Sequence, residues 1–325
     1  MVLGLNDVAR ELKEARRLLF TGHVMPDGDC IGSMLALGLA LEREGKKVAF
    51  VSPGPVPLIY SFLPGVDRIK VAPPVVEDGF DLVVIVDTSV PERLGDLFVA
   101  ADKLRQSGSR TLVIDHHISA LPFGDLFYVD PEAAAVGEIV YDLLKLLNLE
   151  IDRDIATCLY VTLITDTGGF CYETTTAATH RRVAELIEAG VDVRDVSRRL
   201  FEEKPLKSIE ALRAALNTLE VSPCGRVAWM VLDADTLNRL QVQEEHTDGV
   251  VNYARFIRGV EVALLFREVG ERRVKVSFRS KSRVDVSRLA AMFGGGGHLR
   301  AAGALVEGEM DQVKKAVLEA SMAAV

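Results

Sequence analysis

Cysteines are few in this chain, and their spacing excludes two common ways of stabilising a protein. The 325 residues include four cysteines, none of them in a C-x-x-C pair: Cys30, Cys158, Cys171 and Cys224. This spacing predicts neither a disulfide framework nor a thiolate zinc site. The longest apolar stretch, residues 31–41, is interrupted by two glycines and a serine and is too short to cross a bilayer. The first 20 residues lack the pattern of a signal peptide. We therefore expect a cytoplasmic protein with no membrane segment.

Positive charge and aromatic side chains are also scarce compared with what long nucleic acids require. The chain has 38 Lys and Arg against 47 Asp and Glu, a net charge of -9, and 6% aromatic residues. Binding to long duplexes depends on many phosphate contacts from basic side chains, and long single strands are bound by stacked aromatics. We therefore expect no long duplex among the partners. A small anionic substrate is compatible with a local patch of positive charge.

The sequence does contain apolar runs that alternate with helical patterns. The runs RLLF, KVAF, LVVIV and TLVI have strand length, and a helical pattern covers about residues 29–44. Near-continuous Val, Ile and Leu runs suit parallel strands that are covered on both faces. The fold class is therefore α/β, with a parallel sheet in a domain of residues 1–188. We expect a helical connector over residues 189–220 and a smaller α/β domain over residues 221–325.

Acidic and histidine side chains gather at the ends of the apolar segments. Four motifs, HVMPDGD, VDTS, DHH and TDTGGF, contain them: His23, Asp27, Asp29, Asp87, Asp115, His116, His117 and Asp166. Ligands of an α/β sheet bind beyond the carboxyl ends of its strands, and an ionised group at the end of an apolar strand needs a partner. Carboxylates combined with imidazole suit Mn²⁺ or Mg²⁺. The joint set predicts two divalent ions bridged by one carboxylate.

Each motif taken singly also has an ordinary structural interpretation. Asp29 could be the N-cap of the helix that it opens, with Asp27 a turn residue, because Asp is a preferred cap. Asp87 could likewise cap a helix after Pro91. A single histidine is more often structural than catalytic. Only the four motifs together favour a metal site over these alternatives.

The four motifs resemble, in the same order, the first four motifs of the DHH phosphoesterase family. In the second domain, residues 294–298 (GGGGH) resemble the GGGH motif of the DHH-associated domain, so the resemblance covers nearly the whole chain. Chain length and this C-terminal type resemble the short stand-alone subgroup that includes oligoribonucleases acting on very short RNA, or nanoRNases, with pAp phosphatase activity. The resemblance implies an active site in the cleft between the two domains.

The resemblance also implies a role for each residue of the set. One metal would be held by His23, Asp27 and Asp87. The other would be held by Asp29, Asp87, His116 and Asp166, so that Asp87 is the bridge. His117 would face the scissile phosphate as a donor or proton relay, and Asp115 would orient the histidine pair. The implied cofactors are two divalent ions, with Mn²⁺ ahead of Mg²⁺.

The second domain contains a local excess of positive charge. Residues 272–283 (RRVKVSFRSKSR) hold basic side chains and no acid, and strand alternation would put several on one face: Arg273, Lys275, Ser277, Arg279 and Lys281. This indicates an anion site or, alternatively, a solvated strand face. We expect the consecutive glycines to form a loop whose backbone N–H groups can approach a phosphate closely. The resemblance implies these substrate contacts: Arg279, Ser280, Gly295, Gly296, Gly297, His298 and Arg300.

These observations indicate a hydrolase of phosphate esters, and the choice of substrate is open. We expect release of 5′-mononucleotides from very short RNA and removal of the 3′-phosphate of pAp. Hydrolysis of cyclic or linear dinucleotides such as c-di-AMP and pApA is the alternative, and a catalytically silent nucleotide-binding regulator is the alternative of another class. Departures from the subgroup pattern at Ala120, Cys171 and Leu299-Arg300 bear on substrate preference. Formation of a homodimer is left open.

Overall fold

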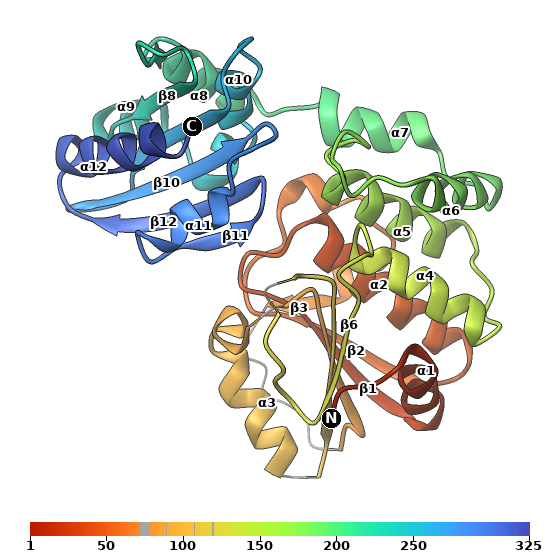
Figure 1. Cartoon of the computed structure of the whole chain (residues 1–325). Helices are drawn as coiled ribbons and strands as arrows, with labels where there is room; N and C mark the ends of the chain where they lie inside the picture. Colours follow the sequence, from red (N-terminus) through yellow and green to blue (C-terminus); the bar gives the residue numbers. More distant parts are fainter. Residues whose placement is uncertain (72–78, 89, 107, 119) are drawn as a thin grey trace. The chain divides into compact units, whose positions relative to one another are not determined.

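The apolar runs of the first half form the strands of a parallel sheet in a computed structural model of the chain (Figure 1). The structure describes residues 1–71, 79–88, 90–106, 108–118 and 120–325, apart from the side chain of His298. It divides the chain into unit 1, residues 1–202, and unit 2, residues 203–325. The division falls inside the segment 189–220 that we expected as a connector.

Unit 1 is built on six described strands, all parallel, in the order β3-β2-β1-β4-β5-β6. Their bounds are Arg17–Thr21 (β1), Lys47–Ser52 (β2), Ile69–Val71 (β3), Leu82–Val86 (β4), Arg110–Asp115 (β5) and Leu126–Val129 (β6). The chain order reverses between β1 and β4, and α/β sheets bind ligands at such a point. The expected α/β class with a parallel sheet is confirmed.

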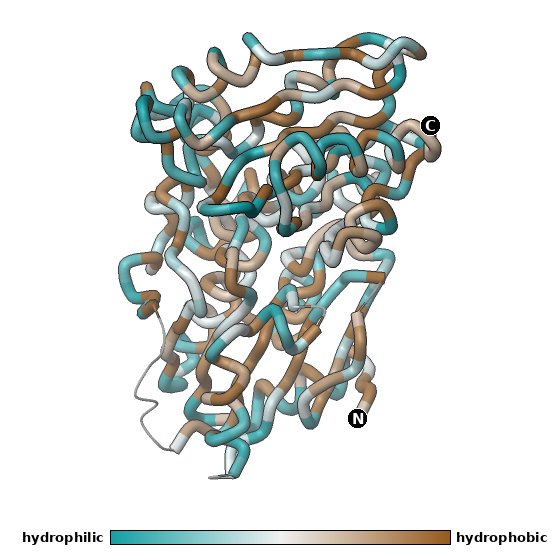
Figure 2. The backbone as a smooth tube through the Cα atoms, turned by 90° about the vertical axis from the view of Figure 1, so that its left-hand side faces the viewer, coloured by the Kyte–Doolittle hydropathy of each residue, from teal (hydrophilic) through white to brown (hydrophobic). Residues whose placement is uncertain are grey.

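Helices cover both faces of this sheet, because alternate strand residues point to opposite sides. Leu18, Phe20 and Val84 belong to a core with α1, α2, α4 and α5, whereas Leu19 and Val83 pack with α3 on the other face. The helices of unit 1 are Leu5–Glu14 (α1), Gly28–Arg43 (α2), Leu97–Gln106 (α3), Val136–Leu146 (α4), Arg153–Asp166 (α5), Ala177–Glu188 (α6) and Val193–Ser197 (α7). Figure 2 shows the apolar segments in brown and the hydrophilic segments in teal.

Short helical turns complete unit 1. They are the 3-10 helices Leu58–Tyr60, Val66–Arg68 and Pro91–Leu94 and the π-helix Arg198–Glu202. The expected helix over about residues 29–44 is observed as α2, with each bound one residue earlier.

Close contacts hold α5 against both α2 and α4. A Cβ atom on Gly32 of α2 would lie 2.6 Å from the carbonyl oxygen of Cys158 in α5, and one on Gly137 of α4 would lie 1.6 Å from Oγ1 of Thr162 in α5. Only glycine permits these approaches, because real Cβ contacts are longer. The contacts therefore hold the N-terminal ends of α2 and α4 near the carboxyl end of α5.

Unit 2 contains a second sheet of six described strands, in the order β11-β12-β10-β9-β8-β7, in which only β8 and β9 pair in parallel. The strands are Glu220–Val221 (β7), Val227–Leu232 (β8), Val262–Glu268 (β9), Arg273–Ser280 (β10), Gly296–His298 (β11) and Ala301–Glu307 (β12). The helices are Leu206–Leu216 (α8), Ala234–Leu240 (α9), the 3-10 helix Glu244–Thr247, Val251–Arg255 (α10), Val286–Ala291 (α11) and Met310–Ala323 (α12).

The core of unit 2 lies on both faces of its sheet. Residues of α11 and α12 pack with β10 and β12 in one cluster, and residues of α8 and α10 pack with β8 and β9 in another. None of the helices in the described part of the chain combines the length and apolar content required to span a membrane.

The α2–α5 contact yields a stability prediction. Replacing Gly32 by Ala should destabilise unit 1 by about 1–3 kcal/mol, because the new methyl group overpacks the contact with Cys158 and Thr162. Urea denaturation followed by far-UV circular dichroism measures the change. Gly4→Ala is the control, since its nearest atom outside the chain neighbours is Asp7 Oδ2 at 3.6 Å. Equal midpoints for Gly32→Ala and wild type would show that the contact is not tight.

Candidate metal centre

The polar motifs of unit 1 converge because their strands end at one edge of the sheet. His23 and Asp27 lie in the turn between β1 and α2, Asp87 directly follows β4, and Asp115 is the last residue of β5. Asp166 is the last residue of α5, which the α2 contact holds at this edge. Ser89, the last residue of the VDTS motif, lies outside the described residues.

Two groups of side chains in this cluster have the geometry of metal-ligand sets. In each group the candidate ligand atoms lie within 4.8 Å of one another. The first group is His23, Asp27 and Asp87, and the second is Asp29, His116 and Asp166. These are the sets that the family resemblance assigns to the two metals, with Asp87 added to the second. The structure thus brings together all six residues; their role as ligands stays a prediction.

Asp87 lies between the two groups. Its Oδ2 is 3.3 Å from Nε2 of His23, and its Oδ1 is 3.8 Å from Nε2 of His116. A third set of close ligand atoms joins Asp87 to His116 and His117. The side chain of Asp87 is 4% exposed, so neither oxygen is solvated by bulk water. Its two oxygens therefore face different imidazoles, as a bridging carboxylate requires.

The backbone of Asp87 adopts the left-handed conformation, with φ of 52°. Asp and Asn tolerate this region better than most residues, although it is sparsely populated. Its N–H donates to the carbonyl of Ile114 on β5, at 3.0 Å. This bend ends β4 at Val86, and Asp87 does not cap the helix after Pro91, whose N-cap is Val90.

Asp27 and Asp29 have different structural roles at the start of α2, and the motif did not indicate which residue has which role. Asp27 is the N-cap, and its Oδ1 accepts from the N–H groups of Asp29 and Cys30 at 3.1 and 3.0 Å. The interpretation of Asp29 as the cap is therefore wrong. Asp29 is 1% exposed and accepts from Val136 N at 2.7 Å and Gly137 N at 3.0 Å, at the N-terminus of α4.

Hydrogen bonds fix both histidines of the DHH motif. Nδ1 of His116 lies 3.1 Å from the carbonyl oxygen of Ala133, which can only accept, so Nδ1 carries the proton and Nε2 is left for a metal. Nδ1 of His117 lies 2.7 Å from Oδ1 of Asp115. Asp115 is fully buried and also accepts from the backbone N–H of His116 and His117. These hydrogen bonds fix the ring of His117, and the catalytic role of Asp115 in orienting it stays a prediction.

Electrostatics in the cluster favour added positive charge. Burial raises the pKa of Asp166 to about 7. Burial and the charge on Asp87 raise the pKa of Asp29 well above its usual range. Burial opposes a charged imidazole, yet the neighbouring aspartates raise the pKa of His23 and of His116 from 6.5 to about 9. Burial also opposes ionisation of Asp87, but His23 and His117 hold its pKa well below the usual range.

The donor atoms fit divalent metal ions. Both ring nitrogens of His23 and Oδ1 of Asp87 are buried and make no hydrogen bond to any described residue. Leaving such groups unpaired costs free energy. Carboxylate oxygens with a minority of imidazole nitrogens form the donor set of Mn²⁺ and Mg²⁺ rather than of a structural zinc site. The residues present therefore suit two hard cations, one in each group.

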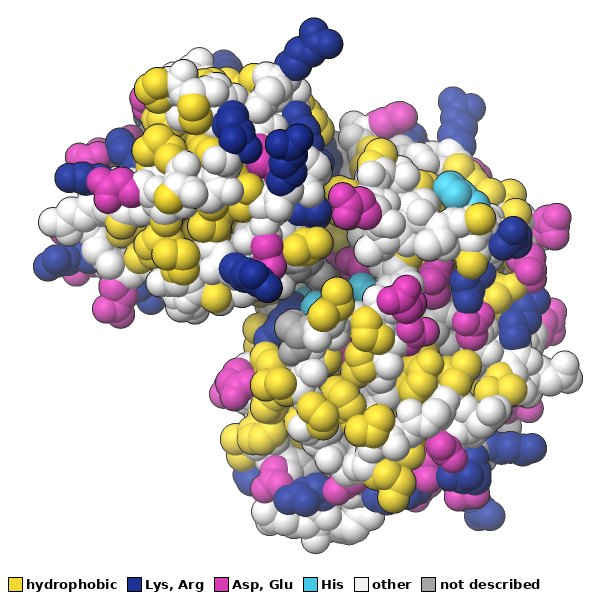
Figure 3. Space-filling model, in the orientation of Figure 1, with side chains coloured by type: hydrophobic (Ala, Val, Ile, Leu, Met, Phe, Trp, Pro, Cys, Tyr) yellow, Lys and Arg dark blue, Asp and Glu magenta, His cyan; other side chains and the backbone are white. Residues whose placement is uncertain are grey.

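The basic residues predicted in unit 2 follow the expected alternation along β10. Val274, Val276 and Phe278 are buried, whereas Lys275 and Arg279 are partly exposed on the other face. Ser280 shares the buried face and is 0% exposed, so the alternation separates it from Arg279. The space-filling view shows Lys and Arg side chains across the visible face of unit 2 (Figure 3).

A cavity of about 300 Å³ lies where β10 ends and β9 begins. Arg226, Lys281 and Arg283 line it together with Glu261. Glu261 is 7% exposed, and its oxygens accept from the N–H groups of residues 282, 283 and 284. The carboxylate thus fixes the loop that carries two of the three cations.

The second part of the glycine motif forms a strand rather than a loop, because residues 296–298 pair with β12, and Gly294 and Gly295 precede this strand. A Cβ atom on Gly295 would lie 2.2 Å from the carbonyl oxygen of Gly303, and one on Gly297 would lie 2.5 Å from that of Ala301. Gly294 has φ of 73°. Gly296 alone of the four has neither a positive φ nor an atom within 4 Å of an added Cβ. The fold therefore requires glycine at positions 294, 295 and 297 but not at position 296.

His298 and Arg300 are the two remaining predicted substrate contacts. The side chain of His298 lies outside the described part of the structure. Arg300 is partly exposed, and its Nη1 donates to the carbonyl of Val284 at 3.1 Å.

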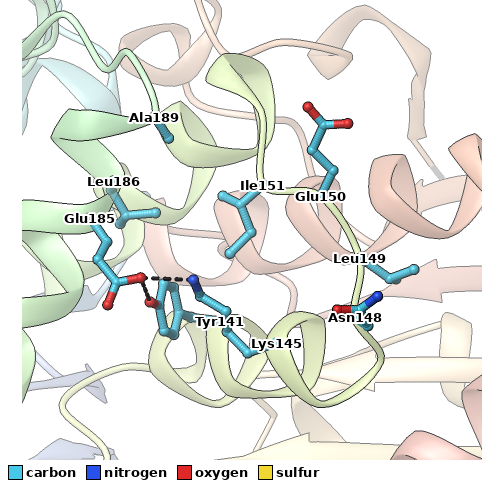
Figure 4. Close-up of a pocket in the computed structure, with 9 residues that line it drawn as sticks. All are labelled: Tyr141, Lys145, Asn148, Leu149, Glu150, Ile151, Glu185, Leu186 and Ala189. Atoms are coloured by element: carbon cyan, nitrogen blue, oxygen red, sulfur yellow. Dashed lines mark hydrogen bonds and ion pairs between the residues drawn. The ribbon is translucent and has the colours of Figure 1, made fainter.

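A second cavity, of about 320 Å³, lies in unit 1 between α4, the α4–α5 loop and α6 (Figure 4). Tyr141 and Lys145 point toward Glu185, which accepts from the hydroxyl of Tyr141 and lies 2.7 Å from Nζ of Lys145. None of its lining residues belongs to the aspartate and histidine cluster. Tyr141, Lys145 and Glu185 bind one another, and we assign no ligand to this cavity.

Backbone groups of residues 133–137 take part in the centre, and the sequence motifs did not reveal them. The carbonyl of Ala133 holds His116, and the N–H groups of Val136 and Gly137 hold Asp29. The side chains in this segment are small and apolar, so no polar pattern marks it. Its position just before a helical pattern was the only available signal, because the first N–H groups of a helix need acceptors.

Comparison with known proteins identifies similar chains and domains. The model of the N-terminal domain of the DHH family matches residues 17–163, and the DHHA1 domain model matches residues 229–323. The bifunctional oligoribonuclease and PAP phosphatase NrnA of Thermus thermophilus is 34% identical over 319 residues, which cover 96% of this chain and 92% of that protein. The protein of the same name from Bacillus subtilis is 30% identical and covers 87% of each chain.

A solved structure is similar over both units. The crystal structure of an exopolyphosphatase-related protein from Bacteroides fragilis aligns with a TM-score of 0.90 and 26% sequence identity. The alignment covers 97% of this chain and 94% of that chain.

Metal binding should compete with protons in this centre. Without metal, His23 and His116 hold protons below pH 9, and Asp166 holds one below about pH 7. The metal-bound forms are deprotonated, so affinity for Mg²⁺ should rise with pH until these groups have titrated. At pH 7, binding should release on the order of three protons per protein. Calorimetric titration in buffers of different ionisation enthalpy measures this number. Affinity that is independent of pH, with no proton release, would contradict the assignment.

Proposed function

This chain belongs to the DHH family, and on that premise we propose that it is a metal-dependent phosphoesterase. It converts very short oligoribonucleotides to 5′-mononucleotides and removes the 3′-phosphate of pAp. The observation that supports this proposal best is the convergence of six side chains in one largely buried centre: His23, Asp27, Asp29, Asp87, His116 and Asp166. Full-length similarity to two proteins named bifunctional oligoribonuclease and PAP phosphatase supports the substrate class.

We propose Mn²⁺ as the metal at both positions, with Mg²⁺ as the substitute. One ion would be held by His23, Asp27 and Asp87, and the other by Asp29, Asp87, His116 and Asp166. The 3.3 Å and 3.8 Å separations of the Asp87 oxygens from two different imidazoles support its role as the bridge. When bound, two divalent ions lower the pKa of water and stabilise charge on phosphoryl oxygens. Cytoplasmic location and dimer formation stay predictions.

The residues next to the metal ligands would handle the proton. Nδ1 of His117 is hydrogen-bonded to Asp115, so we assign the substrate contact to Nε2 of His117. A proton on this nitrogen would be donated to a phosphoryl oxygen or to the leaving oxygen, because imidazolium donates from both nitrogens. Asp115 keeps the ring oriented during this transfer and stabilises its positive charge. No protein nucleophile is needed.

Unit 2 would bind the anionic end of the substrate. Partly exposed Arg279 on β10 and the cations Arg226, Lys281 and Arg283 give this unit a concentration of positive charge in a chain of net charge -9. Gly296 has open space beside its backbone, so a phosphate could approach its N–H closely. A short binding surface of this kind favours a short substrate over a long strand.

A substrate panel tests the proposal. Mn²⁺-loaded protein is mixed with pAp, pApA, c-di-AMP and RNAs of different lengths, with and without a 5′-phosphate, and the products are identified by mass. We expect 5′-mononucleotides from the shortest RNAs and adenosine 5′-monophosphate from pAp. Faster turnover of c-di-AMP than of either substrate would replace this proposal by the dinucleotide phosphodiesterase alternative. No turnover of any substrate would favour a binding protein.

Replacing Asp87 by Asn tests the bridge. Asn tolerates the left-handed backbone of this position, so the fold should survive while the bridging charge is lost. Turnover should fall at least about 10²-fold, because the ions supply several kcal/mol of transition-state stabilisation, and the Mn²⁺ stoichiometry should fall below that of wild type. Asp102→Asn is the control, since Asp102 pairs with Arg105 on the surface of α3. Near-normal turnover by Asp87→Asn would sink the two-metal assignment.

Replacing Gly296 by Ala tests the contribution of the glycine strand. The structure has room for the methyl group, so thermal stability should stay at the wild-type value, while KM should increase because a phosphate can no longer approach the backbone closely. Gly295→Ala is the contrasting variant: its methyl group would lie 2.2 Å from the carbonyl oxygen of Gly303, so stability should fall. An unchanged KM in Gly296→Ala would remove this strand from the substrate site.

A further inference from the structure

The N-terminus of α4 is capped in an unusual way that ties it to the metal centre. Its N-cap residue is Ala135, which has no side chain able to cap a helix. The N–H groups of the next two residues, Val136 and Gly137, donate instead to the carboxylate of Asp29 on α2. The orphan donors of one helix thus hold a proposed metal ligand from another helix.

The turn before α4 has a second contact with the centre. The carbonyl of Ala133 accepts from Nδ1 of His116, which presents Nε2 toward Asp29, Asp87 and Asp166. Residues 133–137 therefore fix one proposed ligand through a carbonyl and another through two N–H groups. A small shift of this turn would move both ligands.

Glu138 holds this turn from inside the protein. Its side chain is 7% exposed, and its Oε2 accepts from the N–H of Ala134 at 3.2 Å. Ala134 lies between the carbonyl that fixes His116 and the N–H groups that fix Asp29. Glu138 occupies the third position of α4, from which a carboxylate can reach back to the residues before a helix.

A salt bridge network from α6 supports Glu138. Its Oε1 makes no hydrogen bond to a described residue and lies 3.6 Å from Nη1 of Arg182. Arg182 is itself held by Asp142, through contacts of 3.1 and 2.6 Å, and lies over the ring of Tyr141 at 5.8 Å. A buried carboxylate is costly unless it is paired, so the ion pair with Arg182 stabilises the Glu138 side chain beside the turn.

We propose that Glu138 is a positioning residue of the metal centre: it holds the turn that orients His116 and Asp29. The inference rests on the proposed function, because it takes these two residues as metal ligands. Outer partners of metal ligands typically contribute 10–100-fold to metal affinity. Glu138 acts one step further out, through the backbone of the turn, and touches neither metal nor substrate.

Calorimetric titration with Mn²⁺, without substrate, tests this role in a series of variants. Glu138→Ala should bind Mn²⁺ about 10–100-fold more weakly. Glu138→Gln should stay close to wild type, because its amide oxygen can still accept from the N–H of Ala134. Glu138→Asp should bind more weakly than Glu138→Gln, since its shorter side chain retains the charge but does not reach the turn.

Glu185→Ala is the matched control. Glu185 joins α6 to Tyr141 and Lys145 of α4 (Figure 4), and both of these partners lie outside residues 133–137. Its removal should weaken the same helix pair and leave Mn²⁺ affinity unchanged. Far-UV circular dichroism and thermal melting show whether each variant is folded.

Distinct results separate failure of this role from failure of the proposed function. A wild-type protein that binds no Mn²⁺ would overturn both. Wild-type binding together with equal affinity in Glu138→Ala would overturn the role of Glu138 alone. If Glu138→Ala does not fold, the Mn²⁺ affinities of Glu138→Gln and Glu138→Asp are compared instead. Stronger binding by Glu138→Asp than by Glu138→Gln would overturn the proposal, because it would show that the charge beside Arg182 matters and the hydrogen bond to Ala134 does not.

Discussion

The rest of the structure depends on the cost of bringing acidic side chains together away from water. Five aspartates, Asp27, Asp29, Asp87, Asp115 and Asp166, share one site with three histidines. Carboxylates at such short separations repel one another, and burial adds to the cost of their ionisation. Protons on His23 and His116 offset part of this charge in the metal-free protein. Two divalent ions would offset this charge more completely.

The fold meets this constraint by supplying many of the ligand contacts from the backbone. The parallel sheet delivers three of the motifs to the edge where β1 and β4 diverge. Asp27 caps α2 and Asp29 accepts from the N-terminus of α4, and helix N-termini favour negative charge. The glycine contacts between α2, α4 and α5 keep these helix ends in register. The packing of α2, α4 and α5 therefore determines where the proposed metal ligands lie.

Sequence reasoning was most successful where chemistry is carried by polar side chains at the ends of apolar runs. The strands around RLLF and LVVIV and the set from His23 to Asp166 followed from patterns that have few alternatives once they are combined. The structural alternative considered for this motif named Asp29 as the cap of α2, whereas the cap is Asp27, because two aspartates in one turn suit the same role. Sequence reasoning also predicted a loop for the glycine motif, although residues 296–298 of this motif form a strand that pairs with β12. The backbone contacts of Ala133 and Val136 cannot be recognised from the types of side chain in this segment, because they form only when the chain is folded.

The central claim is that Asp87 joins two metal ions in unit 1. Anomalous X-ray diffraction from crystals grown with Mn²⁺ and without substrate tests it most directly. The account predicts two anomalous peaks about 3.5–4 Å apart, as in other two-metal sites, with one Asp87 oxygen next to each. One peak should also lie beside His23 and the other beside His116. A single peak, or two peaks that do not share Asp87, would contradict the account.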